Sequence, residues 1–248
     1  MENARLTPAG SDSLLALDPD LGSGLDAETA RAARDVVRVR LVKLEAGSAR
    51  GKWGKPAPDL AGLLVIEGAV VRRVATVNRE TAELLGPGDL LRPFEEDGEE
   101  DLPVHTEVHW KVVSPVTLAV IDGPVLQVAA RWPPVAAAIA ARGVRRAQRQ
   151  SVNFSISHLV RIEDRLLLLF WHMADRWGRV SPDGVRLDLP LTHATLALMV
   201  GAERPSVSSA LGRLAERGLI ARLESGGWRL RGPVPDNVGA LLARPPVH

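Results

Sequence analysis

The 248-residue sequence contains no cysteine. This absence excludes disulfides, thiolate zinc sites, cysteine-ligated iron–sulfur clusters and thiol redox sensing. It fits a reducing compartment, and we expect a cytoplasmic protein.

Long apolar runs are missing as well. The run from Leu166 to Trp171, for example, is far shorter than the roughly 20 residues that a helix needs to cross a bilayer. The N-terminal stretch "MENARLTPAGSDSLLALDPD" has no basic flank followed by an apolar segment, so we expect no secretory leader and no membrane partner.

The chain also lacks an excess of either charge, since 31 basic residues stand against 30 acidic ones. A protein that binds nucleic acid through its overall charge is therefore excluded, and any such surface must come from local segregation of charge. The length and a hydrophobic content of 46% suit two modest domains. We find no nucleophile beside a general base and no phosphate-binding loop of the Walker type, and we expect no enzyme.

Short β-rich runs separated by glycine and proline turns occupy the chain from about Val36 to Asp122. Such spacing predicts an antiparallel sandwich or barrel, and with the helices that follow an α+β fold. The predicted strands are "VVRVRLVKL", "LAGLLVIEG", "AVVRRVATV", "TAELLGPGDLL", "HTEVHWKVV" and "VTLAVID".

The pattern becomes helical between Val125 and Gly178. A long helix is expected to start near Pro134, because proline is tolerated in a first turn, and a second helix is expected to end at Gly178. The long helix carries a stripe of mostly small residues at spacings of three and four, which fits packing on the chain's own β domain as well as dimerisation. The stripe is Ala136, Ala140, Gly143, Ala147, Ser151, Phe154 and His158.

Two short helices with a tight turn are indicated after "SPDGVRLDLPLT". Thr192 is placed to cap the first, and Gly201 follows where a left-handed residue would end it and redirect the chain. The second helix should begin at Arg204–Pro205 and end at Gly218.

An apolar stripe in this second helix predicts which face points outward. Its members recur at i, i+3, i+4 and i+7, and they are Val207, Ala210, Leu211 and Leu214. At about 100° per residue, their burial turns Pro205, Ser209 and Gly212 outward. Ser206, Ser208 and Arg213 then lie on the flanks. Such short, polar or basic side chains let a helix enter a groove about 12 Å wide and touch phosphates and base edges.

A hairpin signature, "LIARLESGGWRLRG", follows the second helix and supplies Arg222, Arg229 and Arg231. Between Arg176 and Arg231 there are nine arginines against five acidic residues, which is the local charge excess that DNA binding needs. A small helical bundle with solvated arginines is the alternative. The order of turn glycine, helix and hairpin favours DNA binding.

Residues 162–232, and "LTHATLALMVGAERPSVSSALGRLAERGLI" above all, resemble the winged helix-turn-helix of Crp/Fnr transcription regulators. "LLVIEGAVV" and "ELLGPGDLL" more weakly resemble the glycine turns of that family's cyclic-nucleotide-binding β-roll, and the long helix takes the place of its dimerisation helix. The resemblance implies a homodimer on a two-fold symmetric operator, with RNA polymerase as a further partner.

The resemblance also implies that Arg204 contacts a base or phosphate, that Ser206 and Ser209 lie at the DNA surface and that His193 lies near the backbone. Glu203, Pro205 and Ser209 depart from the family's usual cap and base-reading residues, so the operator is not predictable from the best-known member. The full predicted DNA-binding set is Thr192, His193, Arg204, Pro205, Ser206, Ser208, Ser209, Arg213, Arg222 and Arg229.

Cyclic-nucleotide binding is disfavoured by the loop "GPGDLLRPFEEDGEEDLPVHTEV". The acidic residues at 95–101 would repel a phosphate, and Arg92 is the nearby cation and the candidate effector residue. The effector stays unidentified.

The "HTEVH" segment supports a different interpretation. On a strand, His105, Glu107 and His109 point to one side, as the ligands of a metal sensor or cupin-like metal-dependent enzyme would. No second cluster of histidine and carboxylate matches it, so a structural strand is the simpler interpretation.

The predicted organisation has four parts. An N-terminal arm (1–24) precedes a β-roll (25–128), a dimerisation helix with linker (129–161), and a winged helix-turn-helix domain with a C-terminal tail (162–248).

Overall fold

The computed structural model describes residues 6–49, 53, 58–93 and 106–232. The chain divides into two compact units, a first unit of residues 1–149 and a second unit of residues 150–248. The boundary falls inside the long helix α4 (Pro133–Ser157), so this helix contributes to both units.

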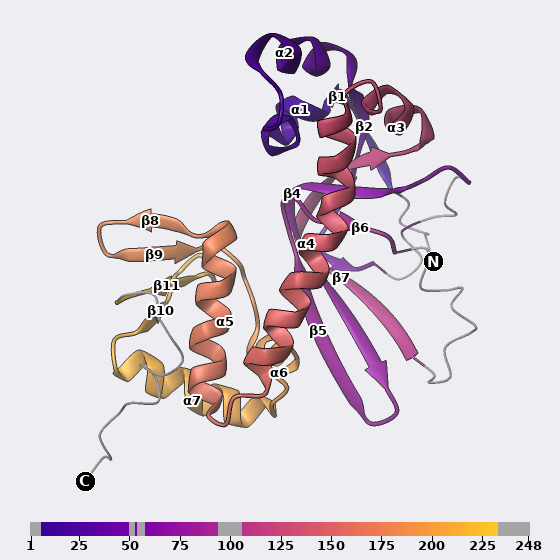
Figure 1. The fold of residues 1–248 in the computed structure, drawn as a ribbon. Coiled ribbons are helices and arrows are strands. Elements are labelled where there is room, and N and C mark those ends of the chain that lie inside the picture. The colour runs from indigo at the N-terminus through magenta and orange to yellow at the C-terminus, as the bar shows by residue number, and fades with distance from the viewer. Residues whose placement is uncertain (1–5, 50–52, 54–57, 94–105, 233–248) are drawn as a thin grey trace. The chain divides into compact units, whose positions relative to one another are not determined.

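An antiparallel sheet forms the centre of the first unit (Figure 1). Five strands follow one another in the order β1-β2-β7-β4-β5, while β3 pairs with β7 and β6 pairs with β4. Their bounds are β1 (Thr7–Ser13), β2 (Arg38–Leu44), β3 (Gly47–Ser48), β4 (Gly62–Thr76), β5 (Arg79–Leu85), β6 (Leu90–Leu91) and β7 (Thr106–Ile121). The predicted antiparallel β architecture is confirmed.

Two strands are longer than the sequence pattern predicted. Most of "LAGLLVIEG" and of "AVVRRVATV" belongs to the single strand β4, and "TEVHWKVV" and "VTLAVI" belong to β7. The glycine predicted to make a turn, Gly68, instead adopts φ +84 within β4, where the register with β7 shifts on both sides of it. A β-bulge therefore absorbs the irregularity, and the strand continues.

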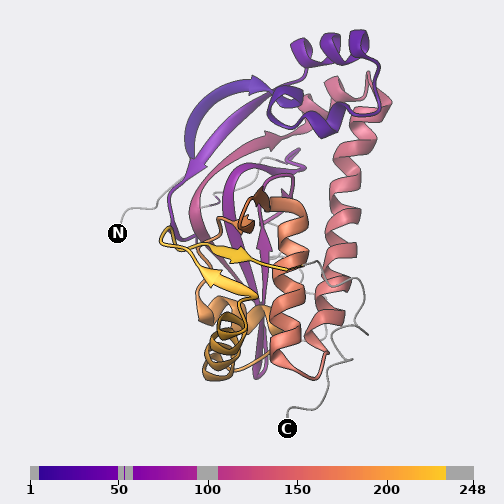
Figure 2. The same cartoon turned by 90° about the vertical axis from the view of Figure 1, so that its left-hand side faces the viewer.

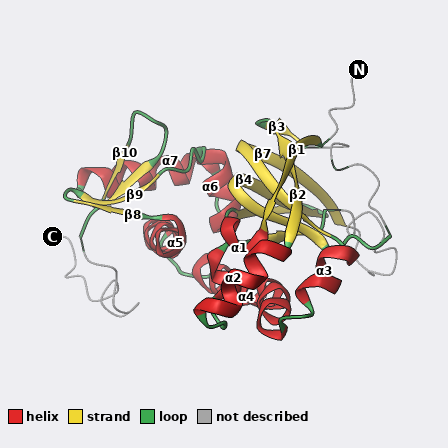
Figure 3. Ribbon diagram, turned by 90° about the horizontal axis from the view of Figure 1, so that it is seen from above, coloured by secondary structure: helices red, strands yellow, loops and turns green. Residues whose placement is uncertain are grey.

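Helices gather at one end of this sheet (Figure 3). They are α1 (Leu14–Leu17), the 3-10 turn η1 (Pro19–Gly22), α2 (Ala27–Val36), α3 (Gly123–Ala129) and the first part of α4. Leu14, Leu15 and Leu21 are buried in one cluster with Val125 and Ile139. The described residues 6–24, which the sequence analysis assigned to an N-terminal arm, thus contribute three leucines to this core.

The second unit contains the end of α4, the helices α5 (Ile162–Trp177), α6 (His193–Val200) and α7 (Arg204–Glu216), and a four-stranded sheet of order β10-β11-β9-β8. The strands are β8 (Arg179–Ser181), β9 (Gly184–Leu187), β10 (Ile220–Arg222) and β11 (Trp228–Leu230). Figure 2 shows the β10–β11 hairpin in yellow, after α7. Buried leucines of α5 and Phe170, whose ring centroid lies 4.9 Å from that of Trp228, form the core.

Among the residues that the structure describes, no helix is long and apolar enough to cross a membrane.

The bulge at Gly68 gives a stability prediction with a matched control. A Cβ on Gly68 would lie 2.1 Å from the carbonyl oxygen of Pro115, whereas a Cβ on Gly10, at φ +95 in the bulge of β1, would meet nothing within 4 Å. Gly10→Ala should lower the free energy of unfolding by about 1–2 kcal/mol through backbone strain alone. Gly68→Ala should lower it by roughly 3 kcal/mol or more, because the clash adds to that strain. Denaturant unfolding of the full chain measures both, and equal losses would contradict the close approach at Gly68.

Candidate nucleic-acid interface

The turn between α6 and α7 has the geometry that the sequence predicted. Thr192 caps α6, its Oγ1 accepting a hydrogen bond of 3.1 Å from the Thr195 amide, and Gly201 ends the helix in the left-handed region at φ 62. Arg165 of α5 donates from Nη1 to the carbonyl oxygens of Val200 and Gly201, at 3.1 and 3.3 Å. Two free carbonyls at the helix end are thereby satisfied, which fixes the turn.

Helix α7 begins at Arg204, with Pro205 in its first turn and Glu203 at the cap without a side-chain hydrogen bond. The predicted stripe is buried, and α7 packs against α5 and α6. Its members Val207, Ala210, Leu211 and Leu214 are each at most 4% exposed. This burial fixes the rotation of α7 about its axis.

The opposite face of α7 is exposed and made of short or basic side chains. The exposed residues there are Arg204, Pro205, Ser206, Ser209, Gly212 and Arg213, while Ser208 is half-buried. A Cβ on Gly212 would meet nothing within 4 Å. The outward face thus agrees with the face predicted from the stripe.

Three of the predicted arginines are engaged within the second unit. Arg213 donates from Nε to Glu163 Oε1 of α5 at 2.5 Å. Arg222 donates from Nη1 to the Leu191 carbonyl oxygen at 3.0 Å, and its guanidinium lies 4.4 Å from the Trp228 ring centroid. Arg229 forms an ion pair with Asp183 at 3.7 Å.

Arg204 differs from these three. It lies at the first position of α7, its side chain is exposed, and no partner for its guanidinium is found among the described residues. The N-terminus of α7 therefore presents an exposed cation that has no partner among the described residues, on the same helix as the exposed Ser206 and Ser209.

His193 connects α6 to α7. The Nδ1 atom of His193 lies 2.9 Å from Ser208 Oγ. The hydroxyl of Ser208 donates its proton to the Arg204 carbonyl oxygen at 3.1 Å. The ring centroid lies 6.3 Å from that of Trp228 in the hairpin. Partial burial lowers the pKa of His193 below its ordinary value, and repulsion by Arg222 and Arg204 lowers this pKa further.

Sequence reasoning missed Glu163 and Arg165. Both lie in the first turn of α5, and each contacts a residue more than 30 positions away in the chain. Nothing in the local pattern distinguishes them from solvated charges, because their roles depend on how the helices pack.

The family model of a "Crp-like helix-turn-helix domain" matches residues 160–232, which include α5 to β11. Residues 160–232 therefore form a Crp-like helix-turn-helix domain, which supports a DNA-binding transcription regulator.

Solved structures share the fold of this chain. FixK2 from Bradyrhizobium japonicum is 18% identical, with 78% of this chain and 93% of that chain covered and a TM-score of 0.57. A CooA variant from Carboxydothermus hydrogenoformans is also 18% identical. The match covers 93% of this chain and 95% of that chain, with a TM-score of 0.59. CLP from Xanthomonas campestris is 20% identical. The match covers 84% of this chain and 100% of that chain, with a TM-score of 0.52. A comparison with curated proteins found no match.

The predicted effector and metal residues lie partly outside the described residues. The acidic segment 95–101 and His105 are outside them, while Arg92 directly follows β6. Glu107 and His109 lie on β7, with Glu107 Oε2 and His109 Nε2 3.4 Å apart. The part of the chain that the structure describes holds no group of three metal-ligating side chains, and the triad that includes His105 stays a prediction.

The predicted dimerisation stripe lies on the surface of α4. Ala140, Gly143, Ala147, Ser151 and His158 are exposed, Phe154 is 67% exposed, and Ala136 is half-buried. Val144, which is 61% exposed, extends the apolar surface beside the stripe and was missed in the sequence pattern.

The environment of His193 predicts its titration. An NMR titration of the free protein should place the pKa of His193 below the ordinary value of 6.5. Arg222→Gln should raise this pKa, because one source of repulsion is removed while burial remains. Arg217→Gln, an exposed arginine at the end of α7, is the control and should leave the pKa unchanged.

The same shift fixes the direction of a pH effect. Folding favours neutral His193, so its contribution to stability is present above the unfolded pKa of 6.5 and is lost as the pH falls from there through the lower pKa of the folded state. A pKa at or above 6.5 in the wild-type protein would contradict the described contacts.

Proposed function

We propose that the protein binds a two-fold symmetric DNA site as a homodimer, with α7 of each copy in the major groove. The observation that carries the proposal is the exposed surface of α7, which includes Arg204, Ser206 and Ser209. In a C2 dimer, two such helices address half-sites about 34 Å apart.

The side chains on this face suit a groove. Short serines and Gly212 allow the helix backbone to approach the base edges, and a guanidinium can pair in bidentate fashion with a guanine. The hydroxyl of Ser209 donates to the Pro205 carbonyl oxygen at 3.2 Å and keeps its lone pairs outward as acceptors. Arg204 is the residue we assign to base reading.

Contacts to phosphate position the domain on the duplex. Thr192 and His193 lie at the N-terminus of α6, where free amides and the helix dipole favour an anion. Ser208 supports His193, while Arg222 and Arg229 lie in the β10–β11 hairpin beside this end. Arg213 contributes through its ion pair with Glu163, which ties α7 to α5.

The exposed stripe of α4 is the proposed dimer interface. Its spacing of three and four residues keeps it on one side of the helix, and its small side chains permit close approach of a second helix. Exposed Phe154 and Val144 would lose contact with water on pairing, which favours association.

Regulation in this proposal does not use a conventionally bound cyclic nucleotide. The arginines of α4 that face the sheet of the first unit are paired with carboxylates of the same chain, and the 95–101 segment is acidic. We further propose that the protein is cytoplasmic, acts with RNA polymerase and has no enzymatic activity.

Arg204→Ala tests the base-reading role. Duplexes are first selected from a random pool with the wild-type protein. The variant should then lose about 1–3 kcal/mol of binding free energy on the best duplex, and the loss should depend on one base pair in each half-site. Fluorescence anisotropy measures the binding free energy of both proteins on duplexes in which one base pair at a time is substituted.

Arg217→Ala, at the exposed C-terminal end of α7, is the matched control and should cost little on every duplex. A wild-type protein that enriches no duplex at low salt, where phosphate contacts are strongest, overturns the proposed DNA binding. A uniform loss for Arg204→Ala would instead assign that side chain to a phosphate.

Ala147→Glu tests the dimer interface. A carboxylate in the middle of the stripe should raise the dimer dissociation constant by about tenfold or more, because two like charges meet across a two-fold axis. Gln148→Glu introduces the same charge at the neighbouring exposed position, off the stripe, and should change the constant little. Sedimentation equilibrium measures both, and equal effects would place the interface elsewhere.

A further inference from the structure

The middle of α4 is held without buried apolar side chains. Within α4, all of which is described, the only buried apolar residues are Val135, Ile139 and Ile156. Between Ile139 and Ile156, the single buried side chain is that of Arg142, at 9% exposed. The usual source of helix packing is therefore missing over this stretch.

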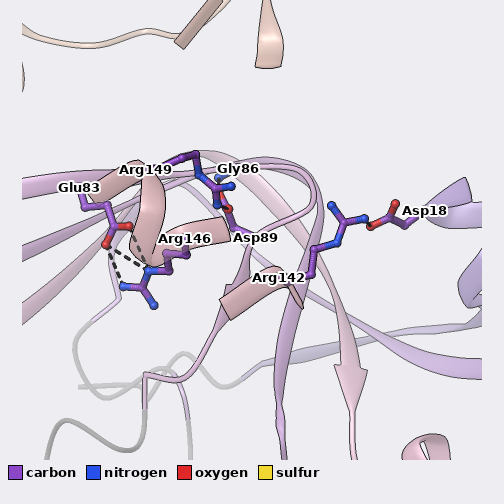
Figure 4. A network of polar contacts seen from close by, with 7 residues as sticks. All are labelled: Asp18, Glu83, Gly86, Asp89, Arg142, Arg146 and Arg149. Carbon is purple, nitrogen blue, oxygen red and sulfur yellow. Dashed lines mark hydrogen bonds and ion pairs between the residues drawn. The ribbon is translucent and has the colours of Figure 1, made fainter. Parts of the chain in front are cut away.

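Three arginine–carboxylate pairs occupy this stretch instead (Figure 4). Arg142 donates from Nη2 to Asp18 Oδ2 at 2.5 Å. Arg146 binds both carboxylate oxygens of Glu83 on β5, with its shortest contacts at 3.0 Å from Nε and 2.8 Å from Nη2. Arg149 pairs with Asp89, which precedes β6. All six side chains belong to the first unit.

The turn Gly86–Asp89 lies against two arginines of α4. Asp89 is fully buried, and its Oδ2 accepts a hydrogen bond of 2.9 Å from the Gly86 amide, while its Oδ1 meets Arg149. Gly88 has φ +85, and a Cβ there would lie 2.9 Å from Arg142 Nη1. One short turn therefore contacts two of the three arginines.

The spacing of the arginines defines one face of α4. Positions 142, 146 and 149 follow an i, i+4, i+7 pattern, which places them in a single row. The stripe that contains Ala140 and Ala147 lies on a different, exposed face. A bidentate pair such as Arg146–Glu83 is directional, so it fixes the rotation of the helix as well as its distance from the sheet.

We propose that these three ion pairs set the rotation of α4 and thereby determine which of its faces is offered to a second copy of the chain. Asp18, Glu83 and Asp89 are positioning residues for dimerisation. The link to dimerisation rests on the proposed homodimer, whereas attachment of the helix by charge does not.

An exchange of charges tests the role of Glu83. Glu83→Arg and Arg146→Glu each place like charges together, so each should raise the dimer dissociation constant by about tenfold or more. Each should also speed hydrogen exchange of the α4 amides at 140–149. The double variant restores opposite charges and should bring both measurements back to within about threefold of wild type.

Glu80→Arg is the matched control. Glu80 lies on the same strand, β5, and pairs with Arg73 of β4 at 2.5 Å, so the same charge change there should leave the exchange of α4 unchanged. If Glu83→Arg fails to fold by circular dichroism, Glu83→Gln replaces it, with faster exchange at 140–149 still expected.

Single variants that fold with wild-type exchange at 140–149 would overturn the proposal, and so would a folded double variant that restores neither measurement. A wild-type chain that stays monomeric would refute the proposed homodimer instead. Hydrogen exchange of α4 distinguishes the two failures, because it reports attachment of the helix in a monomer too.

Discussion

Burial of the apolar stripe of α7 is the constraint on which the proposed DNA recognition depends. Val207, Ala210, Leu211 and Leu214 can meet α5 and α6 in one rotation of the helix only, and that rotation turns Arg204, Ser206 and Ser209 outward. The left-handed Gly201, braced by Arg165, sets the direction in which α7 leaves α6. The proposed recognition surface is thus a consequence of packing.

Arginine has two roles in this chain, and the partners decide between them. Arg142, Arg146, Arg149 and Arg213 are paired with carboxylates and hold helices in place, while Arg222 stacks on Trp228 and braces the hairpin. Arg204 has no such partner among the described residues and remains available to a ligand. A chain of nearly zero net charge can present a local cation to DNA in this way, because several of its arginines are paired with carboxylates of the same chain while Arg204 stays exposed.

Local signals made the helix-turn-helix predictable from the sequence. The cap Thr192, the turn residue Gly201 and Pro205 each act within a few residues, so the bounds of α6 and α7 followed from them. Features that depend on distant contacts did not follow. The leucines near position 15 looked like part of an arm until their core partners on α3 and α4 were known. Gly68 looked like a turn, and neither Glu83 nor Glu163 could be assigned an arginine from spacing alone.

Footprinting of the bound duplex, with the stoichiometry of the complex measured on the same sample, tests the central claim most directly. The account predicts two chains per duplex and two protected segments related by two-fold symmetry, their centres about 34 Å apart on one face of the DNA. Arg204→Ala should weaken both segments equally. A single protected segment occupied by one chain would contradict the account.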